Sequence, residues 1–545
     1  MPTGAGKTKA GLRYSLNNAL KYNRNRIFYI TAYLSVLEQN AADIRRIVNW
    51  DDIVLEHHSN ITDDIKYNFD VEDNSEYEVK EYLKDSWENL IILTTMVQFF
   101  NTLFKEKSSN IRRFCKLINS VIIIDEVQSL PLKVLSNFNL MMNFMKEIMH
   151  CNIVHCTATQ PVLDSVAMRY KIYYGDKDDN NATIISNEQI DKKCFHRVDF
   201  YNLTGKDGRK KLSTEELFEY IETELKLFDS CLVVLNTKAA VASLYNYLNE
   251  NVSDVEIVYL TTNLCAEHRL DIISDMKLKL LQNRMENRHN KIVCVSTKLI
   301  EAGVDVDFDI VFRTLAGIDS LIQCAGRCNR EGKLMINGKY VTGKVYIFSY
   351  SEEDLSYLPD IKAETDAAEY AIRMWCQNNN EDEHIKLEEL QNIYFNKYYI
   401  ENRNNMDYID KKRNSSMLEE LGRNQPAREA YSLSNNIGQK PVMYQAFKTA
   451  AENFELIGQE TVGVIVVYKN QDLLDQLEKA MMEHDYKNVK ETLTKLQPYT
   501  VNMYITPQLQ PFIIKNTEYN VYFLQKEYYD EIRGVIIDKL ADLII

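Results

Sequence analysis

The segment that most constrains the fold is residues 121–128, which read Val-Ile-Ile-Ile-Asp-Glu-Val-Gln. Its first four residues are apolar and β-branched, and the run is too short for a free-standing helix. Such a run is typical of a strand that is buried on both faces, as in a parallel sheet. Asp125 and Glu126 then follow at the carboxyl end of the strand, where open α/β sheets bind ligands. A buried strand that simply ends in a charged turn is an equally good local interpretation.

The start of the chain favours a ligand site. Residues 1–8 nearly complete the phosphate loop Gly-x-x-x-x-Gly-Lys-Ser/Thr, with Met1 in the place of the first glycine. In such a loop, small residues let backbone N–H groups surround the phosphates, Lys7 reaches the β- and γ-phosphates, and the Thr8 hydroxyl helps to hold Mg²⁺. The helical pattern of residues 9–20 would bring a helix N-terminus to the phosphates. A glycine-rich terminus without regular structure is the alternative.

The two motifs together predict nucleoside triphosphate chemistry. One carboxylate after residue 124 would hold Mg²⁺, and its neighbour would polarise the attacking water. A phosphate loop ordinarily follows a buried strand, yet no residue precedes Met1. We therefore expect that the chain is truncated at its front or split from a preceding segment.

Strand and helix patterns alternate along the chain, which predicts the α/β class with doubly wound parallel sheets. We predict a first domain at residues 1–185, whose first strand is missing, and a second domain at residues 186–350. Residues 351–545 would form a linker and an α+β accessory domain. The polar stretches 63–81 and 176–193 read as a surface insertion and a linker.

Three stretches of the last part of the chain carry predictions of their own. Residues 402–424 are polar and are predicted to be mobile, and residues 473–496 read as one helical stretch. Residues 499–529 are rich in aromatic side chains. Stacking on single-stranded bases is one use of such residues, but a packed accessory domain is the favoured interpretation.

Residues 319–330 predict a helix on which Arg327 and Arg330, three residues apart, share a face. Two guanidinium groups that face a cleft suit the charge of a leaving phosphate, whereas a solvated basic face is the alternative.

Residues 157–159 read Thr-Ala-Thr at the end of a strand. They would relay a change at the triphosphate to a bound nucleic acid, or else cap a helix before Pro161.

Composition narrows the cell compartment and the partners. The net charge of −15 does not fit a protein that coats nucleic acid by bulk charge, although a local basic groove stays possible. The ten cysteines form no Cys-x-x-Cys pair, which favours a reducing cytosol over zinc or disulfides. Neither a signal peptide nor a membrane-spanning apolar run is present. We predict a cytoplasmic protein that does not bind membranes.

With these stretches in place, the sequence resembles the superfamily 2 helicases, and more closely the CRISPR-associated effector helicase of type I systems. The motifs that carry the resemblance, in the family's order and spacing, are residues 2–8, 125–128, 157–159, 296–307 and 323–330. The wording around them is also similar, as in Glu38-Gln39-Asn40. The resemblance covers most of the chain and is strongest through residue 332.

The resemblance implies two tandem RecA-like domains that bind ATP and Mg²⁺. It places Thr3, Gly4, Ala5, Gly6, Lys7 and Thr8 at the phosphates, and Thr8 and Asp125 at the metal. Glu126 would polarise the water, and Gln128 would couple hydrolysis to the nucleic acid. Gly303 and Asp305 would line the cleft from the second domain, with Arg327 and Arg330 as arginine fingers. The residues in motifs that touch the nucleic-acid backbone, or couple to it, are Thr95, Thr157, Thr159, Asn236, Thr237, Ser296 and Thr297.

The function implied is ATP-driven movement along single-stranded DNA, with unwinding of target DNA marked by a Cascade-type surveillance complex. The family's N-terminal His-Asp nuclease domain has no counterpart in residues 1–545. A nuclease on a separate polypeptide is one interpretation, whereas the missing strand before the phosphate loop points instead to a truncated reading frame or fragment. A general superfamily 2 helicase that remodels RNA or DNA is the first alternative. An ATPase-dead fragment that acts as a binding module is the second.

Overall fold

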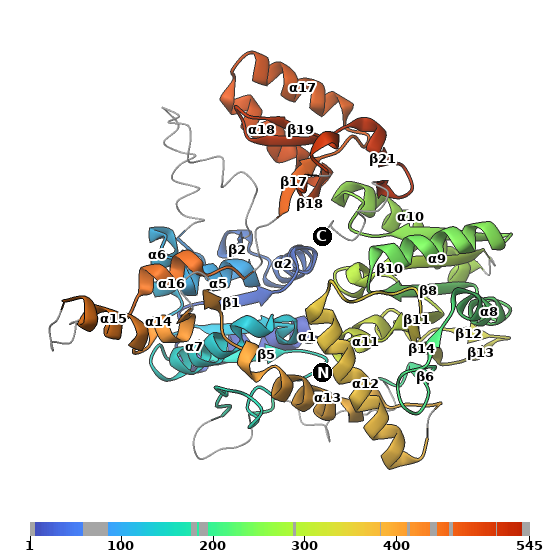
Figure 1. The fold of residues 1–545 in the computed structure, drawn as a ribbon, viewed down its shortest axis with the longest axis horizontal. Helices are drawn as coiled ribbons and strands as arrows, with labels where there is room; N and C mark the ends of the chain where they lie inside the picture. Colours follow the sequence, from blue (N-terminus) through green and yellow to red (C-terminus); the bar gives the residue numbers. More distant parts are fainter. Residues whose placement is uncertain are drawn as a thin grey trace. The chain divides into compact units, whose positions relative to one another are not determined.

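The computed structural model describes residues 6–57, 86–175, 182–184, 195–286, 290–381, 383–410, 415–435, 444–456, 461–507 and 509–536. The chain folds into two compact units, whose elements are labelled in Figure 1. Unit 1 holds the described residues up to 184 together with residues 395–456. Unit 2 holds the described residues 195–394 and 461–536. Residues 351–545, predicted as a linker and accessory domain, are thus divided between the two units.

The centre of unit 1 is a parallel sheet in which the strand predicted from residues 121–124 lies between two others. Its spatial order is β2 (Val54–His57), β3 (Ile91–Thr95), β1 (Ile27–Thr31), β4 (Val121–Asp125) and β5 (Asn152–Cys156). All five residues of β4 are buried, as expected for a β-branched strand inside a parallel sheet. β5 is the edge strand of the described sheet and is less buried.

Helices connect these strands. They are α1 (Lys7–Tyr22), α2 (Leu34–Val48), α5 (Met96–Phe104), α6 (Ser108–Lys116) and α7 (Leu135–Glu147), with the 3₁₀ turns η1 (Asp51–Ile53), η3 (Val127–Ser129) and η4 (Leu132–Val134). Apolar residues of α1 and α2, among them Leu12, Leu37 and Ile44, pack with the sheet residues Tyr29 and Ile123 in one core.

A later part of the chain completes unit 1. It comprises residues 395–401 of α13 (Leu387–Glu401), whose first residues belong to unit 2, together with η8 (Arg403–Asn405), the β15–β16 pair (Ile409–Asp410, Ser415–Ser416), α14 (Met417–Leu421), α15 (Gln425–Asn435) and α16 (Phe447–Asn453). Phe454 is fully buried and lies 6.2 Å from the ring of Phe100 and 5.1 Å from that of Phe104, both on α5. Asn137 of α7 donates a hydrogen bond to Asp407. These residues therefore form a layer on α5 and α7.

Unit 2 is built on a second parallel sheet. Its spatial order is β6 (Val198–Asn202), β14 (Gly343–Tyr350), β11 (Ile310–Thr314), β8 (Ser230–Leu235), β10 (Lys291–Thr297) and β9 (Val255–Leu260), with β7 (Lys211–Leu212) paired to β14. Its other elements are α8 (Thr214–Glu224), α9 (Lys238–Asn251), α10 (Ala266–Glu286), η7 (Lys298–Glu301), α11 (Ile318–Ala325), α12 (Pro359–Asn379) and the β12–β13 hairpin (Met335–Ile336, Lys339–Tyr340).

The end of the chain forms an α+β subdomain of unit 2 (Figure 1). Its sheet has the order β18 (Thr500–Tyr504), β17 (Thr461–Ile465), β20 (Val521–Leu524) and β19 (Ile513–Asn516). The remaining elements are α17 (Gln471–Met482), α18 (Tyr486–Leu496), η9 (Gln497–Tyr499), η10 (Gln510–Phe512), η11 (Lys526–Tyr528) and the β21–β22 pair (Tyr529–Asp530, Gly534–Val535). Cys265, just before α10, belongs to the same apolar core as Val464 and Val501.

The structure confirms the predicted fold class of two parallel-sheet α/β domains with an α+β C-terminal part. Two local predictions are wrong. Residues 473–496 form two helices, because His484 has the left-handed φ of 53° and Asp485 caps α18. Residues 402–424, predicted to be mobile, contain regular structure in their described part, because Asp407 is buried against Asn137 and Ser416 and Glu419 form a capping box. The predicted insertion at residues 63–81 lies outside the described residues.

Candidate nucleotide site and its surroundings

The start of α1 presents the end of the predicted phosphate loop. Gly6 precedes the helix with the left-handed φ of 76°, a conformation that glycine adopts without steric cost. Lys7 and Thr8 therefore lie in the first turn of α1, whose free backbone N–H groups favour anions. The predicted phosphate contacts Thr3, Gly4 and Ala5 lie outside the described residues.

Lys7 meets the acidic pair at the end of β4. Its Nζ lies 2.9 Å from Oε1 of Glu126, and both side chains are largely buried. Glu126 has the left-handed φ of 54°, unusual for a residue with a Cβ, and its N–H donates to the carbonyl of Cys156 on β5. Strained backbone of this kind is concentrated at functional sites. Burial works to lower the pKa of Lys7, but the Glu126 and Asp125 carboxylates outweigh it and raise that pKa.

Asp125 is the buried member of the acidic pair. The hydroxyl of Tyr29 lies 3.4 Å from its Oδ2, whereas its Oδ1 is buried without a hydrogen-bond partner. Burial, and then the neighbouring Glu126 carboxylate, raises the pKa of Asp125 to about 7. The unpartnered oxygen of Asp125 and the hydroxyl of Thr8 are hard oxygen donors of the kind that Mg²⁺ accepts. The residues present therefore fit the predicted metal.

A continuous series of hydrogen bonds runs from the acidic pair to the Thr-Ala-Thr motif. Nε2 of Gln128 donates to Glu126, and Oε1 of Gln128 accepts from the Thr157 hydroxyl at 2.5 Å. Thr157 Oγ1 also accepts from the backbone N–H of Thr159 at 3.0 Å. Together with the Lys7–Glu126 pair, these bonds join five residues of three predicted motifs. We call them the Gln128 relay.

Asn40 is a site residue that received no role from the sequence. The Thr8 hydroxyl donates to its Oδ1 at 3.1 Å, and its Nδ2 is buried without a partner. Because the Thr8 hydroxyl donates its hydrogen to Asn40, its oxygen lone pairs stay available for a cation. A signal existed in the sequence, since Asn40 interrupts the buried apolar stripe formed by Leu37, Ala41 and Ile44 of α2.

The predicted arginine pair belongs to unit 2, and its predicted helical geometry is wrong. Helix α11 ends at Ala325, before either arginine. Residues 327–329 instead pair with Phe308, whose N–H donates to the carbonyl of Arg327 and whose carbonyl accepts from Asn329. This long-range pairing draws the chain out of the helix.

The two guanidinium groups have different surroundings. Arg327 is buried and donates to the carbonyls of Ile300 at 3.0 Å and Glu301 at 2.6 Å. Burial lowers its pKa to about 10. Arg330 is more exposed and lies 3.3 Å from Asp305. Gly303 adopts a left-handed φ of 74° two residues before Asp305.

The residues predicted to touch or couple to nucleic acid hold their own elements in place. The hydroxyls of Thr95 and Thr237 cap α5 and α9 by accepting from Gln98 and Ala240. In unit 2, Ser296 is buried and donates to the Leu260 carbonyl, and Thr297 precedes η7 without a side-chain cap. The Asn236 amide donates to the Leu315 carbonyl and to Glu353. Each of these side chains lies at the carboxyl end of a parallel strand.

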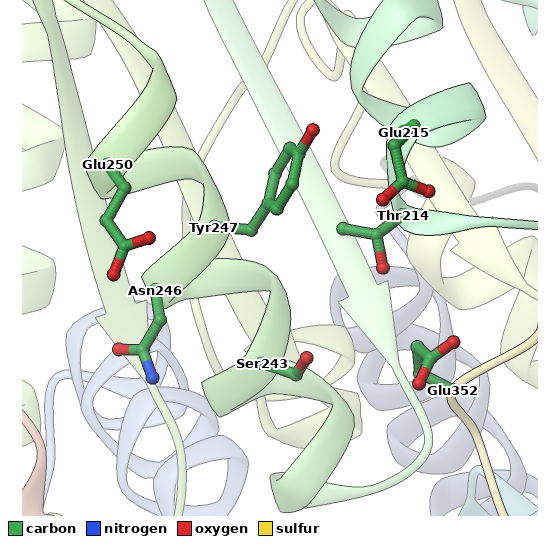
Figure 2. A pocket seen from close by; sticks show the side chains of 7 residues that line it. All are labelled: Thr214, Glu215, Ser243, Asn246, Tyr247, Glu250 and Glu352. Carbon is green, nitrogen blue, oxygen red and sulfur yellow. The ribbon is translucent and has the colours of Figure 1, made fainter.

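Unit 2 also contains a polar hollow of about 450 Å³ (Figure 2). Ser243, Asn246 and Glu250 of α9 lie on one side, and Glu215 at the start of α8 lies on the other. The hollow carries the three carboxylates of Glu215, Glu250 and Glu352, which repel phosphate groups. None of the predicted nucleotide residues lines it, so it is not the nucleotide site.

In the described part of the chain, no group of three or more His, Cys, Asp or Glu side chains is arranged to hold a metal ion. In the same residues, no helix combines the length and the apolar character needed to cross a membrane.

The fold and the site define a class of protein. The family model for the DEAD/DEAH box helicase matches residues 1–166, the part that carries Lys7 and the Asp125–Glu126 pair. A more particular model follows along the chain. The model described as CRISPR-associated nuclease/helicase Cas3, C-terminal, matches residues 228–333.

Individual proteins agree with these models. CRISPR-associated nuclease/helicase Cas3 of Haloferax volcanii is 22% identical, over 65% of this chain and 46% of its own length. The crystal structure of T. fusca Cas3-AMPPNP has a TM-score of 0.62 at 13% identity and covers 100% of this chain and 65% of that one. A structure described as "CRISPR RNA-guided surveillance complex, pre-nicking" has a TM-score of 0.54 at 13% identity, with 100% and 66% coverage.

These findings confirm the resemblance that the motifs indicated: the chain is similar to the helicase part of CRISPR-associated Cas3 proteins. It spans about half the length of the curated relatives in Haloferax volcanii and Methanocaldococcus jannaschii, at 46% and 47%. The solved structures, at 13% identity, support the fold.

Proposed function

We propose that this chain is an ATP-dependent translocase or helicase for single-stranded DNA that acts in CRISPR type I interference. The observation that carries the proposal is the Gln128 relay, because it joins residues predicted to bind and hydrolyse ATP to residues predicted to couple to nucleic acid. The matches to helicase and Cas3 family models support the class.

ATP would bind at the start of α1, with Thr3, Gly4, Ala5, Gly6 and Lys7 at its phosphates. Thr8 and Asp125 would hold Mg²⁺, which would offset the charge of the phosphates. Asn40 would orient the Thr8 hydroxyl. Ionisation of Asp125 is a condition for metal binding, since a protonated carboxyl is a poor ligand.

Phosphate binding would rearrange the Lys7–Glu126 pair. In the structure, the ammonium group of Lys7 is paired with Glu126 at 2.9 Å. A γ-phosphate competes for the same ammonium group, and once Lys7 turns to it Glu126 is left with Gln128 as its partner. The freed carboxylate then accepts the proton of the attacking water. Arg327 and Arg330, with Gly303 and Asp305, would meet the nucleotide from unit 2 and offset the charge of the leaving phosphate.

The nucleic acid would run along the strand-end residues Thr95, Thr157, Thr159, Asn236, Thr237, Ser296 and Thr297, mainly through its backbone. Such contacts position a strand without reading its sequence. A Cascade-type surveillance complex is the proposed partner, supported by the likeness to a chain from an RNA-guided surveillance complex.

The test is ATP hydrolysis by the purified chain with and without single-stranded DNA, in the presence of Mg²⁺. We expect stimulation by DNA and its loss in Glu126→Gln, with nucleotide binding retained. Glu88→Gln is the matched control, because Glu88 also pairs with a lysine of unit 1, Lys116 at 2.6 Å, but on the surface. It should hydrolyse ATP like the parent chain.

Other outcomes select among the alternatives. Stimulation by single-stranded RNA and not by DNA would favour a general remodelling helicase. A folded chain that binds nucleic acid or the surveillance complex but does not hydrolyse ATP would favour a binding module. Turnover that survives in Glu126→Gln would contradict the assigned base.

A further inference from the structure

A buried arginine of unit 2 has no role in the nucleotide chemistry described above. Arg313 lies in β11, a central strand of the second sheet, and only 1% of its surface is exposed. A guanidinium group loses its hydration when it is buried, and that loss must be offset by partners. The partners of Arg313 therefore indicate what the burial achieves.

Arg313 joins three separate segments. Its Nε lies 2.8 Å from Oε1 of Glu301, which is also buried, in the turn after β10. Its Nη2 donates to the Ser320 hydroxyl on α11 at 3.0 Å, and that hydroxyl in turn lies 2.8 Å from both carboxylate oxygens of Glu301. Its Nη1 donates to Oδ1 of Asn236, at the end of β8, at 2.8 Å.

The turn that Arg313 holds is the turn that holds Arg327. The Arg327 guanidinium donates to the backbone carbonyls of Ile300 and Glu301. Glu301 thus binds one arginine with its side chain and the other with its backbone. Arg327 has no carboxylate partner within ion-pair distance among the described residues, so two carbonyls of this turn fix its place.

We propose that Arg313 is a positioning residue: it fixes the turn of residues 298–301 and through it the guanidinium of Arg327. By its bond to Asn236 it also ties this turn to a residue predicted to contact or couple to nucleic acid. That Arg327 then serves ATP hydrolysis rests on the function proposed above, whereas the positioning itself does not.

The first measurement is independent of ATP hydrolysis. Phenylglyoxal modifies accessible guanidinium groups, and mass spectrometry reads the modification at each arginine. Arg327 is 9% exposed, so it should react slowly in the parent chain. In Arg313→Lys the ammonium group reaches Glu301 but cannot also bond Ser320 and Asn236. We expect labelling of Arg327 to rise by about fivefold or more, because the turn opens locally.

The second measurement is steady-state ATP hydrolysis. A guanidinium displaced by about 1 Å lowers kcat by about tenfold or more. The KM for ATP should change by less than about threefold, because the binding residues of unit 1 are untouched. Ser320→Ala removes one bridge and keeps the ion pair, so it should show both effects at reduced size. It serves as the second variant where Arg313→Lys does not fold.

Lys344→Met is the matched control. Lys344 lies on β14, the neighbour of β11, and its side chain pairs with Glu224 at 2.9 Å. It should lower thermal stability while Arg327 stays protected and kcat stays unchanged. Unchanged labelling of Arg327 in both test variants, or an equal rise in Lys344→Met, would overturn the proposal. If labelling of Arg327 rises in the test variants but the parent chain hydrolyses no ATP, the positioning would be upheld and the proposed function refuted.

Discussion

The buried carboxyl of Asp125 should reduce the stability of unit 1 when no nucleotide is bound. The unfolding free energy of the Asp125→Asn variant should show by how much. The Asp125 carboxyl has a buried Oδ1 without a partner and a pKa of about 7, against an ordinary value of 3.8. The folded chain therefore holds a proton on Asp125 more tightly than the unfolded chain does. Stability due to this group is complete below pH 4 and is lost as the pH rises through 7.

The magnitude follows from the two pKa values. Each pKa unit corresponds to about 1.36 kcal/mol, so ionising Asp125 in the folded chain costs about 4 kcal/mol at pH 8. At pH 5 the folded carboxyl is still protonated, and the cost is about 2 kcal/mol. Asparagine has a similar shape and no charge. We therefore expect Asp125→Asn to stabilise unit 1 by amounts near these, larger at pH 8 than at pH 5.

The assay is urea unfolding of the nucleotide-free chain at pH 5, 6, 7 and 8, followed by hydrogen exchange of the β4 amides, which reports on unit 1 alone. Asp309→Asn is the control. Asp309 is also buried, but it accepts hydrogen bonds from the backbone of Asp229 and Ser230 and pairs with Arg284. Its replacement should destabilise unit 2, read from hydrogen exchange of the β8 amides, because an amide nitrogen would face donors.

One result refutes the reasoning. If Asp125→Asn destabilises β4 at pH 8, or if its effect is the same from pH 5 to pH 8, the carboxylate is not strained by its surroundings. Mg²⁺ with ATP provides a further check, since it should stabilise the parent chain and have little effect on the variant.

Two further predictions concern the Gln128 relay and the residues after 395 that pack on α5 and α7 of unit 1. Gln128→Ala removes the link between Glu126 and Thr157, so basal ATP hydrolysis should stay within about threefold while stimulation by single-stranded DNA is lost; retained stimulation would contradict the relay. Phe454→Ala should lower the unfolding free energy of unit 1 by about 3–5 kcal/mol in urea unfolding, because a fully buried ring is lost. Phe447→Ala, in the same segment but 59% exposed, should cost little, and equal losses would contradict the packing.

The elements that the sequence predicted well are those with a strong local pattern. The buried strand β4 follows from four β-branched residues, and the start of α1 follows from Gly6, Lys7 and Thr8. In each case the residues proposed to carry the chemistry are adjacent to the residues that form the element. Local pattern therefore predicts both the element and the site.

The features that were missed depend on partners far along the chain. Arg327 leaves its predicted helix because the residues beside it pair with Phe308. Residues 351–545 are divided between two units, and part of them joins unit 1 where Phe454 packs against Phe100, more than three hundred positions earlier. Arg313 reads as an ordinary charge in an apolar run until Glu301 and Asn236 are placed around it. No periodicity records such contacts.

The residues proposed to serve ATP hydrolysis differ between the two units in how fully their polar groups are bonded, and this difference assigns each unit a proposed role. In unit 1, Asp125 and Asn40 each keep a buried polar atom without a partner, and Lys7 holds a carboxylate that a phosphate can replace. In unit 2, Arg313 has all three of its guanidinium nitrogens bonded, and Arg327 is fixed by two backbone carbonyls. Incompletely bonded groups gain partners when a ligand arrives, whereas fully bonded groups would lose them. Affinity for nucleotide should therefore reside in unit 1, while unit 2 should act on turnover by presenting groups that are already fixed.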